Sequence, residues 1–499
     1  MNSRACVLAL DAGTGSGRAA IFTLDGALIA VADRQWSFTT PPSLDPFGKE
    51  FDAGAFLDML ADATHEALDR AGRCEIRAVA TTGLRGGSVL IDRAGQVVAA
   101  SPIQDVRGIL VVGDVDGAVP DLFRRTGHTP TWLFPLARLA WYRSEEPDVF
   151  ARVATLLAID EWLSFALSGE RRATPAGAGD SMCLDVAART WDDEIFASLD
   201  LPRSLVPPIV NAGEIVGGLT SPAAHRFRLP AGIPVVACAG DTQAALLGSG
   251  VVDAGAVGVV AGTTAPVMAV TASAVWDPEG SLWTGCHPIP SRWVIEGNSG
   301  RAGSSYEWIL DLLGLHGAHR FADAEQLAGS APPGSNRSFA FLGAEPVDLS
   351  KLNPSRPAGF LFPAPELGIP VGRAELLRAS LENVAFAIEA NLRRIETATP
   401  LGTGGLAMTG GLSASDLFAR IVANVTRRPV RRGGHPQGAA LGCAACAAVG
   451  AGEYGDLTES VSAMVRTEIV REPDPATSDV YRDSFEQWHE RWRTLQSIT

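Results

Sequence analysis

Two segments of similar design, about 250 residues apart, constrain the fold of this chain more than any other feature. Residues 7–23 read VLALDAGTGSGRAAIFT, and residues 257–271 read VGVVAGTTAPVMAVT. Each is an apolar run typical of a strand, then a turn containing Ala-Gly-Thr, then a second apolar run. Such an internal repeat reveals architecture. We therefore predict two related α/β domains, at residues 1–246 and 247–499.

The two turns also suggest a ligand. Each brings backbone N–H groups and a threonine hydroxyl to a sharp bend, at Thr14 in the first copy and at Gly262 and Thr263 in the second. Groups arranged in this way bind phosphate oxygens. If the two turns face each other, they bind a polyphosphate in a cleft between the domains. The G-x-G-x-G in the first copy is a weak dinucleotide motif, because a strand rather than a helix follows it.

Asp241 is the first candidate for catalysis. It follows the apolar run PVVACA and a glycine, and precedes a helical pattern of small residues. A carboxylate at such a position needs a hydrogen-bonding partner or a ligand. Two interpretations stay open on spacing alone: a helix N-cap, for which Asp is preferred, and a catalytic carboxylate.

Other polar residues lie at predicted strand ends. Arg85 follows the strand IRAVATT in a glycine-rich loop, where it either reaches a cleft or lies on the surface. Gln104 and Asp105 lie just beyond a predicted hairpin, and Gln243 adjoins Asp241. We take these four residues as candidates for binding a polar substrate.

A third turn follows the strand GLAMT, where Gly410-Gly411 leads into a helix with hydroxyls at Ser413 and Ser415. Free N–H groups at a helix start favour an anion or the edge of a nucleotide. The arginines at 427–432 form a basic cluster that we interpret as a solvated face. Amphipathic spacing predicts long helices over 373–396 and 478–496.

Composition and charge limit the class of protein that this chain can be. The chain has 499 residues, enough for two or three domains with full cores, and its net charge is −15 from 41 basic and 56 acidic residues. An acidic chain disfavours nucleic acid and anionic membranes as partners. No signal peptide or membrane-spanning run is recognisable, so we expect a cytoplasmic enzyme.

Seven cysteines are scattered along the chain, as in proteins of a reducing compartment. Cys443 and Cys446 form a C-x-x-C pair within a helix of small residues, without a second pair to complete a zinc site. Core packing is therefore the favoured interpretation. Trp132, Phe134 and Trp141 are likewise interpreted as core residues rather than as a wall of a substrate site.

Taken in order, these motifs resemble those of FGGY-type carbohydrate kinases, a branch of the actin-like ATPases, over essentially the whole chain. The shared motifs are D-x-G-T-x-S-x-R from Asp11 to Arg18, Gly240-Asp241, Gly262-Thr263, G-G-x-S-x-S from Gly410 to Ser415, and a helix motif from Arg378 to Phe386. Within the family, several stretches are similar to autoinducer-2 kinases, and the Gly-Asp-x-Gln pattern also resembles glycerol kinases. The resemblance implies two duplicated actin-like, ribonuclease H-like domains with the nucleotide and substrate in the cleft between them.

The resemblance also implies an activity, the ATP-dependent phosphorylation of a sugar or polyol hydroxyl. Asp241 would then be the general base, and Asp11 with Asp241 would hold Mg²⁺. The phosphates of ATP would contact Thr14, Gly262 and Thr263, and the adenosine would contact Gly410, Gly411 and Ser415. Candidate substrates are a ketose such as xylulose or ribulose, or the autoinducer-2 precursor. Family members are often dimers, so a homodimer is expected.

Departures from the family pattern bear on the substrate. Gly86 stands where glycerol-type and autoinducer-type kinases carry a Glu after the Arg, Arg138 stands where a Lys is usual, and Gln437 replaces a frequent Glu. A usual acceptor for a substrate hydroxyl is therefore missing. Two alternatives remain: a switch ATPase of the actin or chaperone type, and a non-catalytic sugar-binding relative. Sugar-dependent ATP turnover distinguishes them.

Overall fold

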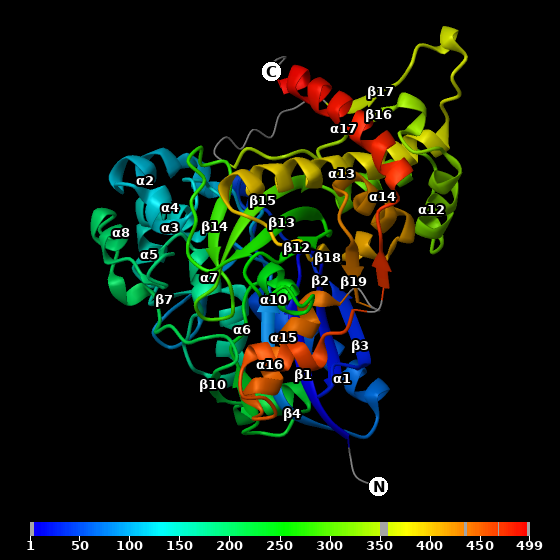
Figure 1. Cartoon of the computed structure of the whole chain (residues 1–499). Helices are drawn as coiled ribbons and strands as arrows, with labels where there is room; N and C mark the ends of the chain where they lie inside the picture. The colour runs from blue at the N-terminus through cyan, green and yellow to red at the C-terminus, as the bar shows by residue number, and fades with distance from the viewer. Residues whose placement is uncertain (1–3, 350–357, 434–436, 468, 497–499) are drawn as a thin grey trace.

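A computed structural model describes residues 4–349, 358–433, 437–467 and 469–496. It contains two large sheets, one above the other in Figure 1. The first sheet has the order β10-β11-β4-β1-β2-β3. Its strands are β1 Arg4–Ala12, β2 Ser16–Thr23, β3 Leu28–Gln35, β4 Cys74–Gly83, β10 Ile215–Gly218 and β11 Pro234–Val236.

The second sheet repeats this plan. Its order is β14-β15-β13-β12-β18-β19-β20. Its strands are β12 Val257–Val260, β13 Thr264–Thr271, β14 Trp283–Cys286, β15 Trp293–Arg301, β18 Leu406–Thr409, β19 Val430–Arg432 and β20 Ile469–Arg471. In each sheet, an antiparallel meander (β1-β2-β3 or β12-β13-β15) lies on one side of the first strand, and two parallel strands lie on the other. This common topology confirms the duplicated α/β fold.

Smaller strands make up the rest. A three-stranded sheet has the order β6-β5-β7, and two two-stranded sheets are β8-β9 and β16-β17. Their strands are β5 Ser88–Ile91, β6 Val97–Ser101, β7 Thr155–Ala158, β8 Leu184–Asp185, β9 Thr190–Trp191, β16 Phe339–Phe341 and β17 Gly359–Leu361. Several of these strands belong to an aromatic-rich region beside the first sheet. Phe134 and Trp141 are buried there, which confirms them as core residues.

Helices up to the second sheet are α1 Ala53–Ala71, α2 Val112–Ala118, α3 Leu122–Thr126, α4 Pro135–Glu145, α5 Pro147–Phe150, α6 Ile159–Ser168, α7 Pro175–Gly179, α8 Asp193–Ser198, α9 Ser221–Phe227 and α10 Asp241–Leu247. Later helices are α11 Gly303–Leu312, α12 Arg320–Ser330, α13 Arg373–Ala398, α14 Asp416–Thr426, α15 Gly438–Gly450, α16 Leu457–Met464 and α17 Pro475–Gln496. The long helices predicted over 373–396 and 478–496 are confirmed as α13 and α17.

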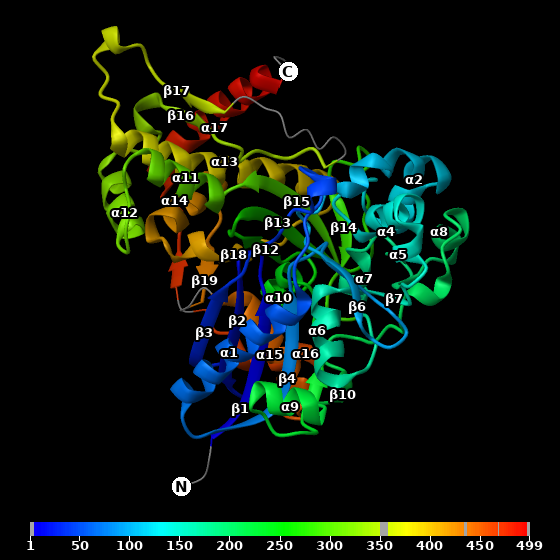
Figure 2. The same cartoon turned by 180° about the vertical axis from the view of Figure 1, so that it is seen from behind.

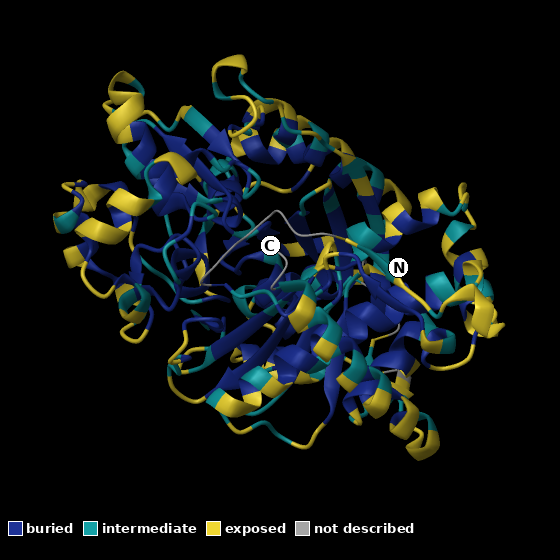
Figure 3. Ribbon diagram, turned by 90° about the horizontal axis from the view of Figure 1, so that it is seen from above, coloured by how far each residue is buried: buried dark blue, intermediate teal, exposed yellow. Residues whose placement is uncertain are grey.

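Strand β1 is apolar along most of its length because both faces of the first sheet are covered. Leu8 and Leu10 join the core cluster that contains residues of α1 and α6, whereas Val7 and Ala9 join the cluster that contains α15 and α16. Figure 2 shows α1 and α6 in front of this sheet, and Figure 1 shows α15 and α16 on its other face. In Figure 3, buried positions gather along the strands of both sheets.

Helix α15 therefore links the halves of the chain: it follows β19 of the second sheet and packs against the first. Its contact with α10 is close, because a Cβ on Gly442 would lie 1.9 Å from the Ala244 carbonyl oxygen. Cys443 and Cys446 are fully buried in this contact, which confirms the core interpretation. The Cys446 Sγ lies 3.5 Å from that of Cys238.

None of the helices in the described ranges has the length and apolar character needed to cross a lipid bilayer.

Candidate active site

Three parallel strands of the first sheet end together. Ala12 of β1 pairs with Gly83 of β4, and Gly83 forms a bridge to Gly240 beyond β11. The side chains that flank these positions are Asp11, Arg85 and Asp241. Ligands of open α/β sheets bind outside the carboxyl ends of the strands. Helix α10, which begins at Asp241, lies between the two sheets in Figures 1 and 2.

Asp241 does not act as a helix cap. The N-cap of α10 is Gly240, and no side chain caps this helix. The Asp241 Oδ1 instead accepts a hydrogen bond from the Thr242 hydroxyl at 3.1 Å. Burial raises the pKa of Asp241, and the nearby Arg85 guanidinium opposes this rise. The carboxylate is thus held beside other charged groups rather than used in the helix, and this geometry favours the second interpretation of the sequence.

Asp11, at the same edge, is a buried acid. Its Oδ2 accepts a hydrogen bond from Arg18 Nη1 at 3.0 Å, whereas its buried Oδ1 has no hydrogen-bonding partner among the residues that the structure describes. Burial raises the pKa of Asp11 to about 6; Arg18 opposes this rise, and the charge of Asp241 adds to it. Two carboxylates that repel each other, one with an unused oxygen, suit a divalent cation.

Two carboxylates suit Mg²⁺ better than they suit a metal ion whose ligands all come from the protein. Over the described parts of the chain, no three His, Cys, Asp or Glu side chains gather closely enough to hold a metal ion. Mg²⁺ needs only one or two carboxylates, with waters and phosphate oxygens as its other ligands.

Parallel strands of the second sheet also end together, and glycine-containing turns follow them. Val260 of β12 pairs with Thr409 of β18, so Gly262 and Gly410 leave the sheet side by side. Gly410 has φ +93°, and a Cβ there would lie 2.6 Å from the Ala261 carbonyl, which only glycine permits. The candidates that this places at one edge are Gly262, Thr263, Gly410 and Gly411.

Ser415 and Gly303 also lie at this edge of the second sheet. The Ser415 hydroxyl accepts a hydrogen bond from the Phe418 N–H at 3.1 Å, so it caps α14. The sequence analysis missed Gly303, whose N–H donates to the Gly262 carbonyl at 2.9 Å. Helix α11 therefore begins against the Gly262–Thr263 turn, with its N-terminal N–H groups at that edge.

Arg85 lies in a network that joins the two sheets. Its Nη1 and Nη2 donate to the two carboxylate oxygens of Glu296, at 2.7 and 2.8 Å. Its Nη1 also lies 3.8 Å from Asp180 Oδ1. Burial alone would lower the pKa of Arg85, but the carboxylates of Glu296 and Asp180 outweigh it and raise that pKa. Arg85 is thus largely buried between the two sheets rather than solvated at the surface.

Gln243 and His128 complete this network. Gln243 Nε2 donates to Asp180 Oδ2 at 3.0 Å, and His128 Nε2 lies 4.0 Å from Asp180 Oδ1. Burial lowers the pKa of His128 to about 4, so its ring is neutral at pH 7. Its Nδ1 lies 2.9 Å from the Thr126 carbonyl and therefore carries the proton, which leaves Nε2 as an acceptor.

Aromatic rings lie beside these polar groups. The ring of Trp283 is 5.1 Å from that of His128 and 5.0 Å from that of Phe134, between ring centroids. Trp283 on β14 also pairs across the sheet with Glu296 on β15. Both Phe134 and Trp283 belong to the buried aromatic core, which packs directly against the network around Asp180.

Gln104 and Asp105 lie in a neighbouring network. The fully buried Asp105 accepts a hydrogen bond from Arg107 Nε at 2.9 Å, so its carboxylate is engaged within its own loop. Gln104 has a buried Oε1 without a hydrogen-bonding partner. No recorded interaction joins either residue to Asp241 or Asp180 within the described ranges.

Arg138 joins the loop that contains Asp105 to the glycine-rich loop that follows Arg85. It donates to the Asp105 carbonyl at 3.3 Å and also to the Gly86 carbonyl. Gly86 itself has φ +65°, and a Cβ there would meet Ile103 at 3.0 Å. A glutamate would therefore be strained at position 86, so the missing acceptor is a consequence of this backbone.

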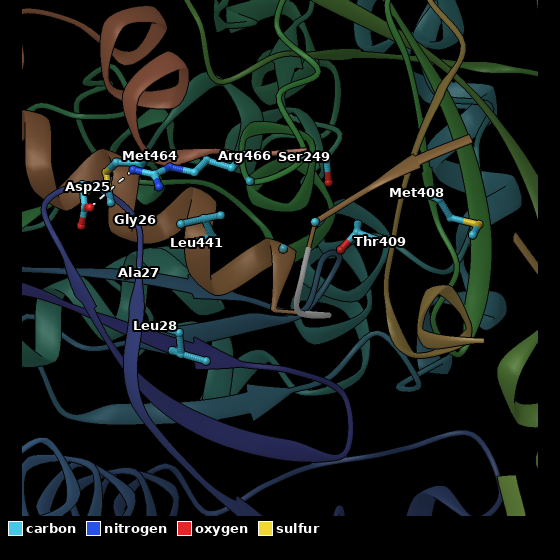
Figure 4. Close-up of a pocket in the computed structure, with 13 residues that line it drawn as sticks. Asp25, Gly26, Ala27, Leu28, Ser249, Met408, Thr409, Leu441, Met464 and Arg466 are labelled. Atoms are coloured by element: carbon cyan, nitrogen blue, oxygen red, sulfur yellow. Dashed lines mark hydrogen bonds and ion pairs between the residues drawn. The ribbon is translucent and has the colours of Figure 1, made fainter. Parts of the chain in front are cut away.

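A separate cavity of about 370 Å³ lies between the β2–β3 turn, the end of β18 and the start of α15. Figure 4 shows Asp25 and Arg466 at one end of it, paired at 3.4 Å, and Thr409 at the other. Its two charged lining residues neutralise each other, so it offers no counterpart to the acidic network around Asp180.

Sequence reasoning missed Asp180, Glu296 and His128. Glu296 had one usable signal, a charged residue inside the otherwise apolar strand WVIEG. Asp180 and His128 come from loop-rich segments without periodicity, so no comparable signal marked them.

The fold and site define a class: a protein of duplicated actin-like domains, with two acids at the strand ends of the first sheet and glycine turns at the strand ends of the second. Comparison with known proteins agrees. Residues 6–248 match the model of the N-terminal domain of the FGGY family of carbohydrate kinases, and residues 257–451 match that of the C-terminal domain. The chain belongs to the FGGY family of carbohydrate kinases.

Individual relatives differ in the substrate their names give. An autoinducer-2 kinase of Escherichia coli (strain K12) is 30% identical, with 97% of this chain and 94% of that protein covered. The structure of a xylulose kinase from Rhodospirillum rubrum is 27% identical with a TM-score of 0.85, over 99% of both chains. A Plasmodium falciparum glycerol kinase with ADP, 18% identical with a TM-score of 0.84 and covering 98% of this chain and 99% of its own, shares the fold.

Proposed function

We propose that this carbohydrate kinase transfers the γ-phosphoryl group of ATP to a hydroxyl of a small sugar or sugar-like substrate, with Asp241 as the general base. The substrates suggested by its relatives are autoinducer-2 and xylulose. The observation that carries the proposal is the half-buried carboxylate of Asp241, which does not cap its helix and lies beside Asp11 and Arg85. Residence in the cytoplasm and a homodimeric state remain predictions.

In this mechanism Asp241 accepts the proton of the attacking hydroxyl. Its carboxylate is ready for this role because, among the described residues, the Thr242 hydroxyl is its one side-chain hydrogen-bond donor. The phosphates of ATP would contact the N–H groups and hydroxyls of the turns at Thr14 and Gly262–Thr263. The adenosine would lie against Gly410 and Gly411. Phosphoryl transfer depends on such positioning and on charge neutralisation rather than on covalent catalysis.

Asp11 and Asp241 are the residues that would hold Mg²⁺, as the unused Asp11 Oδ1 supports. Bound with ATP, Mg²⁺ would neutralise charge on the phosphates. Arg18 keeps the second oxygen of Asp11 oriented across the β1–β2 pair.

Coupled ADP release with ATP and Mg²⁺, measured across ketopentoses, polyols, aldoses and autoinducer-2, tests the proposal. We expect turnover to depend on one acceptor. Asp241→Asn should lower kcat by at least about 1,000-fold while ATP still raises the thermal midpoint, because the base is lost and the nucleotide turns are not. Asp253→Asn, at an exposed acid, is the matched control.

If turnover survives Asp241→Asn, another group is the base. ATP hydrolysis that no acceptor stimulates would instead support a switch ATPase.

A further inference from the structure

The network around Arg85 contains a carboxylate from the other half of the chain. Glu296 lies on β15 of the second sheet, whereas Arg85 follows β4 of the first. Their bidentate pair is largely removed from solvent, since the side chains are 14% and 3% exposed for Arg85 and Glu296. A paired arginine fork fixes the direction of the carboxylate as well as its charge. Glu296 is therefore held at the site and cannot swing away.

Asp180 is held in the same network from the first half. Gln243, two residues after Asp241 in α10, donates a hydrogen bond from its amide to Asp180. The oxygen of that amide, Gln243 Oε1, is buried and has no hydrogen-bonding partner within the described parts of the chain. It lies close to Gly240, since a Cβ on that glycine would be 3.0 Å from it. An unpaired buried acceptor on the amide that binds Asp180 indicates that a hydroxyl donor of a ligand completes the site.

The charge of this network is negative. Asp180, Asp241 and Glu296 contribute three carboxylates, and Arg85 contributes one positive charge. His128 adds none, because its neutral ring presents an acceptor toward Asp180. Hydroxyl groups can donate to these acceptors, whereas a carboxylate or phosphate on the substrate meets like charge in a site of low dielectric.

We propose that Asp180 and Glu296 are specificity-determining residues that accept hydrogen bonds from substrate hydroxyls and restrict the enzyme to uncharged polyhydroxy acceptors. Asp180 and Glu296 supply the acceptors that the glycine at position 86 cannot. Arg85 is a positioning residue, which aims the Glu296 carboxylate through its two parallel hydrogen bonds. Sugars that already carry a carboxylate or phosphate are excluded. This inference rests on the proposed function.

The experiment compares acceptors of equal length and different charge. D-xylulose and D-ribulose are assayed beside D-xylonate and D-ribonate, with ATP and Mg²⁺ at pH 7.5. The wild-type enzyme should use its preferred ketose with a kcat/KM at least 100-fold above that of the matching aldonate. Glu296→Gln and Asp180→Asn should each raise KM for the ketose at least 10-fold, with KM for ATP changed less than twofold. Each should also reduce the 100-fold preference at least fivefold, because a negative charge is removed.

Two controls separate specificity from folding. Glu296→Asp keeps the charge but withdraws the carboxylate, so it should raise KM for the ketose and retain the preference over the aldonate. Glu453→Gln removes an exposed charge and should change neither value. A thermal shift with ATP confirms that each variant is folded.

The outcomes separate a failure of this inference from a failure of the proposed kinase activity. An aldonate used as well as the ketose, or an unchanged preference in folded Glu296→Gln and Asp180→Asn, overturns the roles of both carboxylates and leaves the kinase intact. Absence of turnover with every acceptor overturns both proposals.

Discussion

Asp11→Asn should make the nucleotide-free protein more stable while it damages catalysis. The pKa of Asp11 is raised from 3.8 to about 6 by burial, with Asp241 adding to the rise. Because the folded-state pKa lies above the unfolded one, the stability linked to this group is fully present below about pH 4. It is lost as the pH rises through about 6. At pH 7.5 the ionised carboxylate therefore weakens folding, and an asparagine does not.

The size of this effect follows from the two pKa values. At about 1.4 kcal/mol for each tenfold change in proton affinity, a rise from 3.8 to about 6 corresponds to about 3 kcal/mol at pH 7.5. At pH 4.5 the unfolded chain is only partly ionised, and the same relation leaves about 1 kcal/mol. The advantage of Asp11→Asn in the free energy of unfolding should thus shrink by about 2 kcal/mol between the two pH values.

Urea unfolding at pH 7.5 and 4.5, without nucleotide, measures this difference. Asp33→Asn is the matched control, because Asp33 is exposed on β3 of the same sheet and should change stability by less than about 0.5 kcal/mol. Saturating ATP and Mg²⁺ should reverse the ranking, since ligand bound to the folded state stabilises it. A variant that is less stable than wild type at pH 7.5, or equally more stable at both pH values, would refute the reasoning.

Two other substitutions test the network and the helix contact. Arg85→Ala should raise KM for the sugar at least 10-fold and KM for ATP less than threefold, because it leaves Glu296 buried without its partner; equal effects on both KM values would remove Arg85 from the sugar site. Gly442→Ala should lower the free energy of unfolding by about 2 kcal/mol or more and reduce kcat, because its Cβ would overlap the Ala244 carbonyl of α10. Gly113→Ala, where nothing lies within 4 Å, should show neither effect in the same denaturation and kinetic assays.

The large elements could be predicted because their signals are local. The two strand-turn-strand copies are contiguous apolar runs, and the topology of both sheets confirms the duplication that they indicate. The helices at α13 and α17 follow from periodicity within one segment. The packing of α15 on the first sheet could not be predicted in this way, because a helix of small residues carries little sign of which face it buries.

Residues of the site are harder to predict from sequence than strands and helices are. Asp105 and Asp180 show the reason. Both are buried acids in irregular segments, so their sequence contexts are alike. Asp105 finds a cation two residues away in Arg107, and this local pair engages its carboxylate. Asp180 depends on Arg85, which is distant in sequence and already donates both terminal nitrogens to Glu296. Asp105 is therefore paired within its own loop, whereas the packing of the two sheets brings Arg85 and Glu296 together beside Asp180.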